Sequence, residues 1–165
     1  LAALSVGITL FWDQSLGVKA LGTIGSGFKE MLWILPPVFI LLGLLDVWVP
    51  RDTMVKYMGE GSGFIGGVLA FILGSAAAGP LYVAFPVAEA FLKKDVKFIN
   101  VMILVGAWSA TKIPMLLFEY SSLGPAFTLT RLIINIPLVL FIAFVLDKAA
   151  RESDREQIYR NAKGV

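Results

Sequence analysis

Long apolar runs constrain the fold of this chain more than any other sequence feature. A helix that spans a bilayer needs about 20 mainly apolar residues, and five segments approach that requirement. They are residues 1–12, interpreted as the end of a longer run, and residues 31–49, 62–92, 98–118 and 125–146. The third of these segments is too long for a straight, untilted crossing. The pattern predicts an all-α, polytopic membrane helix bundle with about five transmembrane segments.

The composition indicates the same class. The chain has 165 residues, of which 58% are hydrophobic and 16% charged, and its mean hydropathy is +0.81. Soluble domains have about 45–50% apolar and about 25% charged residues, so lipid must solvate most of this chain. We expect the lipid bilayer as a partner and no nucleic acid. Cysteine and histidine are absent, which removes thiolate and imidazole chemistry, and we expect neither a metal nor another cofactor.

The two ends of the sequence differ in character. Residues 1–12 show no basic start, and Trp12-Asp13 is a poor cleavage site, so we do not interpret them as a signal peptide. The densely charged residues 147–165 must lie in water. We predict a transmembrane domain over residues 1–146 and a charged tail over residues 147–165.

Lysine and arginine set the expected orientation, because cytoplasmic loops of membrane proteins are enriched in both. If all five segments cross, one side receives Lys19, Lys29, the lysines of residues 93–97 and the cations of the tail. The other side receives only Arg51 and Lys56. This bias predicts a multi-pass protein of the cytoplasmic membrane with its C-terminus in the cytoplasm.

Proline and glycine interrupt most of the apolar segments. The interruptions are Pro36-Pro37, Gly79-Pro80, Lys112-Ile113-Pro114 and Pro137. Proline removes a backbone donor and kinks or breaks a helix, and freed backbone groups at membrane depth require protein or trapped water to satisfy them. We expect broken third and fourth helices that face a shared interior. The alternative is that proline is simply common in membrane helices.

Small residues recur at helical spacing in the third segment, where they let another backbone approach closely. They are Gly59, Gly63, Gly67, Ala70, Gly74 and Ala78. Packing within the monomer and contact with a second copy are equally compatible with this stripe.

Ionisable side chains inside the segments are costly, at about 2.5–3.5 kcal/mol on insertion scales. Lys112 and Arg131 are the clear cases, and Asp46 and Glu119 lie nearer a boundary. We expect the four to share one charged layer, roughly 10 Å below the outer surface. In one interpretation an acid neutralises a cation and holds the bundle together, which is favoured for Arg131. In the other a cation stays available to attract an anion or gate a pathway, which is favoured for Lys112.

A helix that begins at Pro80 would place its positive end near the middle of the membrane, where transporters hold anionic groups. Polar side chains that could add hydrogen bonds there are Ser75, Tyr82, Asn100, Ser109, Thr111 and Asn135. The predicted pathway consists of Ser75, Gly79, Pro80, Tyr82, Ser109, Thr111, Lys112, Pro114 and Asn135. The sequence shows no metal cluster, catalytic triad or phosphate-binding loop, so we do not expect an enzyme.

Four stretches carry a resemblance to a known family. Residues 44–50 (LLDVWVP), 74–82 (GSAAAGPLY), 85–88 (FPVA) and 106–114 (GAWSATKIP) resemble the bacterial and archaeal predicted-permease family that includes the organoarsenical exporters. The resemblance covers roughly residues 31–146. Larger members look like two related halves in one chain, and this sequence looks like one half. The resemblance therefore implies a permease that completes itself by pairing.

One departure from the family pattern concerns the substrate. Members linked to arsenicals carry cysteines near residues 75–79, where this chain has only small residues. Trivalent arsenic is soft and prefers sulfur, so we do not infer an arsenical substrate.

Together these features favour a secondary permease for a small solute or ion, with an anion suggested by Lys112, working as a homodimer of half-size subunits. The charge bias favours a parallel two-fold dimer over an inverted one. The alternatives are a non-transporting membrane subunit that holds a partner through its small-residue face, and a passive channel.

Overall fold

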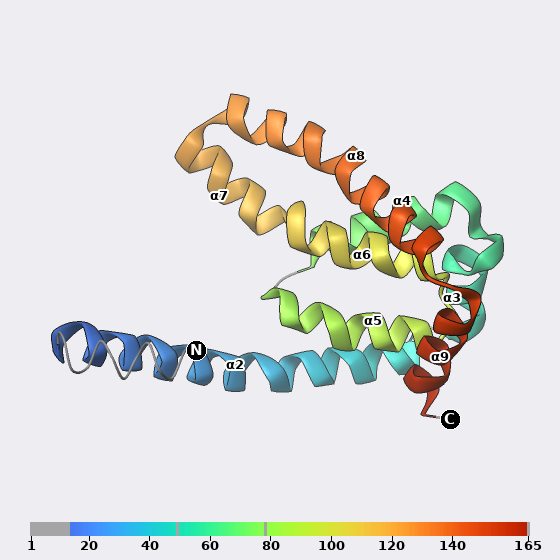
Figure 1. Cartoon of the computed structure of the whole chain (residues 1–165), viewed down its shortest axis with the longest axis horizontal. Coiled ribbons are helices and arrows are strands. Elements are labelled where there is room, and N and C mark those ends of the chain that lie inside the picture. The colour runs from blue at the N-terminus through green and yellow to red at the C-terminus, as the bar shows by residue number, and fades with distance from the viewer. Residues whose placement is uncertain (1–13, 49, 78, 165) are drawn as a thin grey trace. The chain divides into compact units, whose positions relative to one another are not determined.

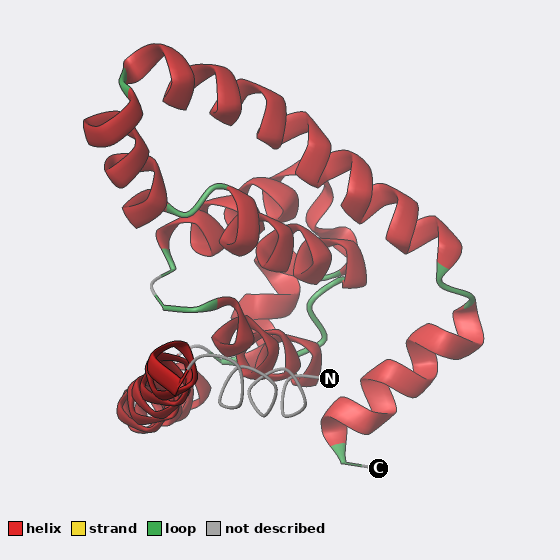
Figure 2. Ribbon diagram, turned by 60° about the vertical axis from the view of Figure 1, so that its left-hand side comes forward, coloured by secondary structure: helices red, strands yellow, loops and turns green. Residues whose placement is uncertain are grey.

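The computed structural model describes residues 14–48, 50–77 and 79–164. The predicted first segment, residues 1–12, and residues 49, 78 and 165 lie outside the described residues. The chain divides into two compact units, residues 1–41 and residues 42–165. Every regular element among the described residues is a helix (Figure 2), which confirms the predicted all-α class.

The first described helix, α2, runs from Gln14 to Trp48 and contains the predicted second segment. Lys19 and Lys29 lie between the first two predicted segments, where a loop connection was expected, but residues 14–30 are helical. No proline interrupts residues 14–35, so nothing in the backbone chemistry forces a break there. Pro36 and Pro37 lie inside the helix without ending it.

After the end of α2, the described residues of the second unit form eight α- or 3₁₀-helices that build the bundle and a final helix in the tail. They are α3 (Arg51–Met58), η1 (Glu60–Ser62), α4 (Gly63–Ala76), η2 (Leu81–Val83), α5 (Ala84–Lys93), α6 (Phe98–Ala110), α7 (Ile113–Leu123), α8 (Pro125–Ala149) and α9 (Glu152–Lys163). The breaks expected in the third and fourth segments are present between α4 and η2 and between α6 and α7.

The predicted third segment does not cross from one end of the bundle to the other. Residues 63–93, here called the returning segment, consist of α4, η2 and α5, and both ends lie together. The backbone N–H of Lys97 donates to the carbonyl of Met58 at 2.9 Å, and Lys97 Nζ lies 3.1 Å from a carboxylate oxygen of Glu60. Arg51 likewise pairs with Asp95. The expectation that Arg51 and Lys56 lie on the side opposite residues 93–97 is therefore wrong.

The direction of the helices shows the same return. Asn100, near the start of α6, donates to Met58 O at 2.8 Å, and Thr111, just past its end, bonds Ser75 at 2.8 Å. Helices α4 and α6 therefore run parallel, which two consecutive crossings could not do. Helix α5 lies between α4 and α6 in the sequence and runs in the opposite direction. It also packs on α6 (Figure 1).

Close packing on α6 explains much of the small-residue stripe. Gly74 faces the backbone of α6 so closely that an added Cβ would lie 2.3 Å from the carbonyl oxygen of Leu104. Ala70 is also fully buried. The inner part of the stripe therefore serves contact within the monomer, whereas Gly63 and Gly67 line an open apolar groove between α4, α6 and α8. Ala78 lies outside the described residues.

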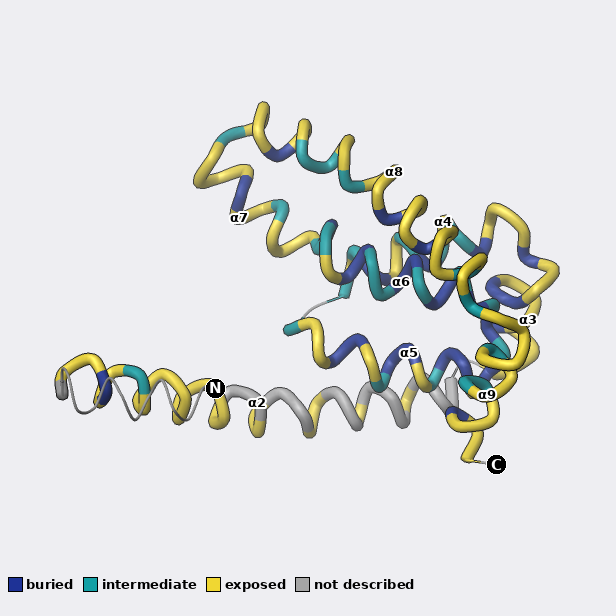
Figure 3. Tube along the Cα trace, in the orientation of Figure 1, coloured by how far each residue is buried: buried dark blue, intermediate teal, exposed yellow. Residues whose placement is uncertain are grey.

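Helices α6, α7 and α8 form the rest of the membrane part. Gly124, with φ of +86°, turns the chain between α7 and α8, and Pro125 starts α8 at a position where no backbone donor is needed. Helix α8 then runs antiparallel to α6, with Val139 against Gly106. The dark-blue positions of Figure 3 gather on α5 and α6, while α8 is exposed along most of its length. Large exposed apolar residues such as Ile133 and Phe141 suit contact with lipid.

Two helical stretches among the described residues are long and apolar enough to cross a membrane. They are Phe98–Leu123, which joins α6 and α7, and Pro125–Ala149. A third stretch, Arg51–Met58 with Glu60–Ala76, qualifies only if its 43° bend is included. The second part of this bent stretch contains α4, which is the first helix of the returning segment.

Candidate functional site

The tip of the returning segment meets the break between α6 and α7. Gly79 adopts φ of +103°, a conformation that favours glycine, and Pro80 follows it. The Gly79 carbonyl accepts hydrogen bonds from Trp108 Nε1 at 3.3 Å and from Lys112 Nζ at 3.0 Å. The hydroxyls of Ser75 and Thr111 bond each other at 2.8 Å. Two helix breaks that are about 30 residues apart in the sequence thus form one junction.

The last carbonyl of α6 is satisfied from α8. The carbonyl of Ala110 accepts hydrogen bonds from a terminal nitrogen of Arg131 and from Asn135 Nδ2, both at 3.2 Å. The last carbonyls of a helix have no partner within the helix, and the helix dipole makes this end negative. Arg131 supplies both the donor and the opposite charge that this end requires.

The four ionisable residues of the predicted charged layer have different surroundings. Arg131 forms an ion pair with Glu119, which is 5% exposed. Lys112 is half-buried and binds a backbone carbonyl, and among the described residues it has no carboxylate partner. The side chain of Asp46 lies outside the described residues, although its backbone belongs to α2.

The electrostatic potential at the start of α7 is positive. Lys112 is the N-cap of α7, and Pro114 lies in its first turn. A helix N-terminus has unpaired backbone N–H groups and a positive dipole end. The ammonium of Lys112 and this helix end therefore favour an anion at the same place.

The other predicted pathway residues occupy different parts of the second unit. Asn135 and Thr111 contribute to the junction, whereas Tyr82, Ser109 and Pro114 are exposed on η2, α6 and α7. Asn100 binds Met58 O and Ser62 Oγ, at the opposite end of α6 from the junction, and has a structural role there.

Sequence reasoning did not single out Trp108. Its ring is 5% exposed and its N–H reaches the carbonyl of Gly79. A buried indole N–H requires an acceptor. A tryptophan two residues before a helix end was therefore a signal in the sequence for a contact with a backbone carbonyl of another segment.

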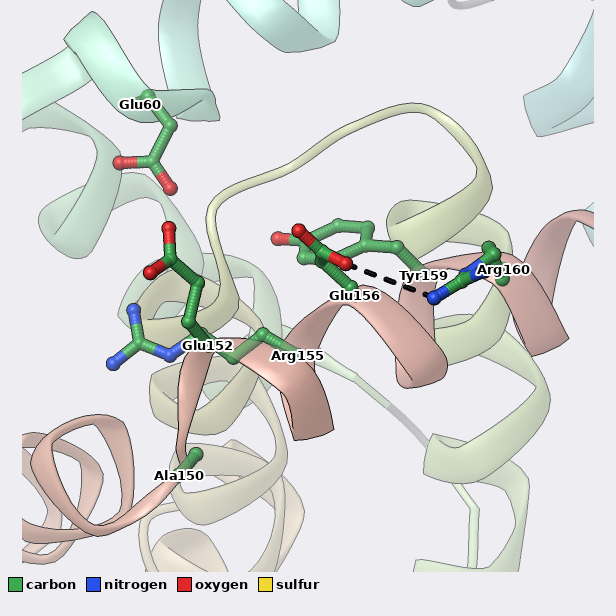
Figure 4. Close-up of a pocket in the computed structure, with 7 residues that line it drawn as sticks. All are labelled: Glu60, Ala150, Glu152, Arg155, Glu156, Tyr159 and Arg160. Carbon is green, nitrogen blue, oxygen red and sulfur yellow. Dashed lines mark ion pairs between the residues drawn. The ribbon is translucent and has the colours of Figure 1, made fainter.

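Another cavity of the second unit lies at the charged tail. It has a volume of 680 Å³ and is lined by Glu60, Ala150 and five residues of α9 (Figure 4). In Figure 4 the carboxylates of Glu60 and Glu152 face each other, and Glu156 pairs with Arg160 further along α9.

The hydroxyl of Tyr159 donates a hydrogen bond to the carbonyl of Val96 at 2.7 Å. Burial, with the nearby negative charges of Glu60 and Asp95, raises the pKa of Tyr159 to about 12. These contacts dock the tail, and the cavity lies outside the apolar helices.

Nothing in the described residues resembles a metal centre. The part of the chain covered by residues 14–48, 50–77 and 79–164 contains no group of three histidine, cysteine, aspartate or glutamate side chains able to hold a metal ion. The junction offers hydroxyl, carbonyl, ammonium and guanidinium groups instead.

Comparison with known protein families shows which family the chain belongs to. The sequence model of the family ArsP_1, described as a predicted permease, matches residues 18–164. The chain belongs to this predicted permease family. The matched range includes the returning segment, the junction and the tail, so the ArsP_1 assignment supports a membrane permease. Neither curated proteins nor solved structures give a significant match.

Proposed function

We propose that this permease is a secondary transporter of a small anionic solute whose pathway passes the junction between the returning segment and the α6–α7 break. The observation that carries the proposal is the state of Lys112. Its ammonium sits at the N-terminus of α7 and has a carbonyl for a partner, so its charge is not cancelled by a carboxylate in the described residues. Half-helix ends and unpaired cations at this depth are the groups that membrane transporters use for anions.

We further propose a homodimer of half-size subunits in the cytoplasmic membrane with the C-terminus in the cytoplasm. Ser109, Arg131 and Asn135 are polar and only partly covered, although they lie in apolar helices. A second copy would shield them from lipid. The end of the second unit that carries the tail also carries Arg51, Lys56 and the lysines of residues 93–97, and residues 113–130 contain neither lysine nor arginine. This bias supports a single orientation and a parallel pair.

The test is a flux assay on the purified protein in liposomes. The panel comprises chloride, inorganic phosphate, sulfate and small carboxylates, compared with neutral amino acids, and the variants are Lys112→Met and Arg131→Met. We expect saturable, gradient-driven anion uptake that Lys112→Met abolishes. Lys112→Met should lower the free energy of unfolding by no more than about 1.5–3 kcal/mol, which is the range for one hydrogen bond to a charged group. Arg131→Met should cost about 3–5 kcal/mol, because it leaves Glu119 buried without its partner.

Other results would assign a different role. Flux without saturation would identify a passive channel, and no flux together with co-purification of another protein would identify a non-transporting subunit. Normal transport by Lys112→Met, or loss of transport only through unfolding in a detergent melting assay, would make Lys112 structural.

A further inference from the structure

The ion pair between Glu119 and Arg131 leaves one carboxylate oxygen unused. Glu119 is 5% exposed, and one of its oxygens accepts from Arg131. The other oxygen, Oε2, is fully buried and contacts no hydrogen-bond donor among the residues that the structure describes. A buried carboxylate oxygen without a donor is costly, and a proton on that oxygen removes the negative charge that makes it so.

Few charged groups face this carboxylate. Helix α8, which packs against α7, contributes Arg131, while α6 and α4 contain no ionisable residue. On α7 itself, Lys112 lies two turns earlier at the N-cap and Tyr120 is exposed. In the described residues, Arg131 is therefore the cation that holds Glu119 in its ionised form.

Arg131 also faces open space. It lines a cavity of 240 Å³ with Phe127, Thr130, Ile134 and Asn135, all on one face of α8. The same guanidinium donates to the carbonyl of Ala110, next to Lys112. Arg131 thus lies between an internal carboxylate, an open cavity and the proposed pathway.

We propose that Glu119 binds the coupling proton of the permease and that Arg131 binds the transported anion once Glu119 is neutral. The inference rests on the proposed function, because it names the coupling ion of the same pathway. A proton adds to Oε2 and Glu119 becomes an uncharged acid. Arg131 then exchanges its carboxylate partner for the anion, and one proton and one anion move together without net charge. When the anion leaves, the proton leaves Glu119 and the ion pair forms again.

The exchange follows from the repulsion between two negative charges at one guanidinium. An ionised Glu119 already occupies Arg131, so an anion at Arg131 would lie against the charge of Glu119 in a medium of low dielectric constant. Protonation removes that penalty. Proton and anion therefore favour each other, which is the thermodynamic requirement for coupling.

The experiment reads the proton directly. Infrared difference spectra of the full chain in detergent are recorded at about pH 5.5 with and without chloride, inorganic phosphate or sulfate, because exposed glutamates, with an ordinary pKa of about 4.3, stay ionised there. We expect a protonated-carboxyl band that appears when the anion is added and that Glu119→Gln loses completely. Glu89→Gln is the matched control, because Glu89 is an exposed partner of Lys93, and it should keep the band. If Glu119→Gln does not fold, the double variant Glu119→Gln with Arg131→Met removes both charges together and must also lack the band.

A second measurement follows proton movement in liposomes that contain a pH-sensitive dye, driven by gradients of the same inorganic anions. We expect anion-dependent proton uptake in the wild type and anion flux independent of pH in Glu119→Gln. No band that depends on Glu119, with anion flux intact, would overturn the coupling and leave the proposed function standing. A band without flux of any anion would overturn the proposed function while proton binding by Glu119 holds.

Discussion

Asp95 joins three segments that are far apart in the sequence. Its carboxylate accepts from Lys163 of α9 at 2.6 Å and pairs with Arg51 of α3. It also adopts φ of +56°, a left-handed conformation that asparagine and aspartate tolerate better than most residues. Partial burial raises the pKa of Asp95, but the hydrogen bonds and charges of Lys163 and Arg51 outweigh it, so the pKa is lowered overall. Ionised Asp95 therefore favours the folded state.

The variant Asp95→Asn tests this contribution, because asparagine keeps the shape and tolerates the backbone conformation. A carboxylate whose pKa is lowered by folding stabilises the protein above its ordinary value of 3.8, and this contribution is lost as the pH falls through the folded value. We expect Asp95→Asn to melt below the wild type at pH near 7, with the difference closing below about pH 3.8. Glu89→Gln, which removes an exposed pair on one helix, should differ little from the wild type at either pH. A difference for Asp95→Asn that persists unchanged in acid would show that the charge is not responsible.

At the scale of elements, the contact between α4 and α6 decides where the returning segment lies. Small side chains allow it, since Gly66 and Gly74 face α6 with no room for a Cβ. The tip then reaches Trp108 and Lys112. A change in this contact should therefore affect both stability and the junction.

Gly74→Ala tests this contact. Its Cβ would lie 2.3 Å from the backbone oxygen of Leu104, which cannot rotate away, so the helices must separate. We expect a loss of about 1–3 kcal/mol in the free energy of unfolding. Gly61→Ala is the control, because nothing lies within 4 Å of its added Cβ. Equal melting temperatures of the two variants in detergent would contradict the packing of α4 on α6.

At the scale of the whole molecule, the returning segment changes the sidedness of the chain. The connections before α4 and after α5 lie together, and the backbone of Lys97 bonds that of Met58. Arg51 and Lys56 therefore join the side that also carries Lys93 and the tail. In residues 42–165 the charge asymmetry becomes stronger than a count over five crossings predicts.

Single cysteines test this arrangement, and the natural sequence contains none that would interfere. The variants are Lys56→Cys, Lys93→Cys, Ser153→Cys and Ser122→Cys, all at exposed positions. In sealed vesicles, a membrane-impermeant maleimide should label the first three from one side and Ser122→Cys from the other. Labelling of residues 56 and 93 from opposite sides would restore a third crossing and refute the return.

The sequence by itself determined the class of this protein and the location of its breaks. Hydropathy is a property of each run of residues. The chain breaks at Gly79-Pro80 and before Pro114 because glycine permits a positive φ, while proline fixes its own φ and lacks a backbone donor. Family membership is also a property of sequence, and the resemblance that predicted it is confirmed over residues 18–164.

Only the tertiary structure decided whether a broken helix crosses or returns, and which partner each buried cation takes. An apolar segment of either kind has the same composition, and the contacts that distinguish them join residues about 40 positions apart, as between Arg51 and Asp95. The sequence favoured an ion pair for Arg131 and an available charge for Lys112, but only the structure shows that the partners are Glu119 and the carbonyl of Gly79. The sequence leaves the partners open because partner choice depends on which helix ends meet in space, and no local pattern encodes that meeting.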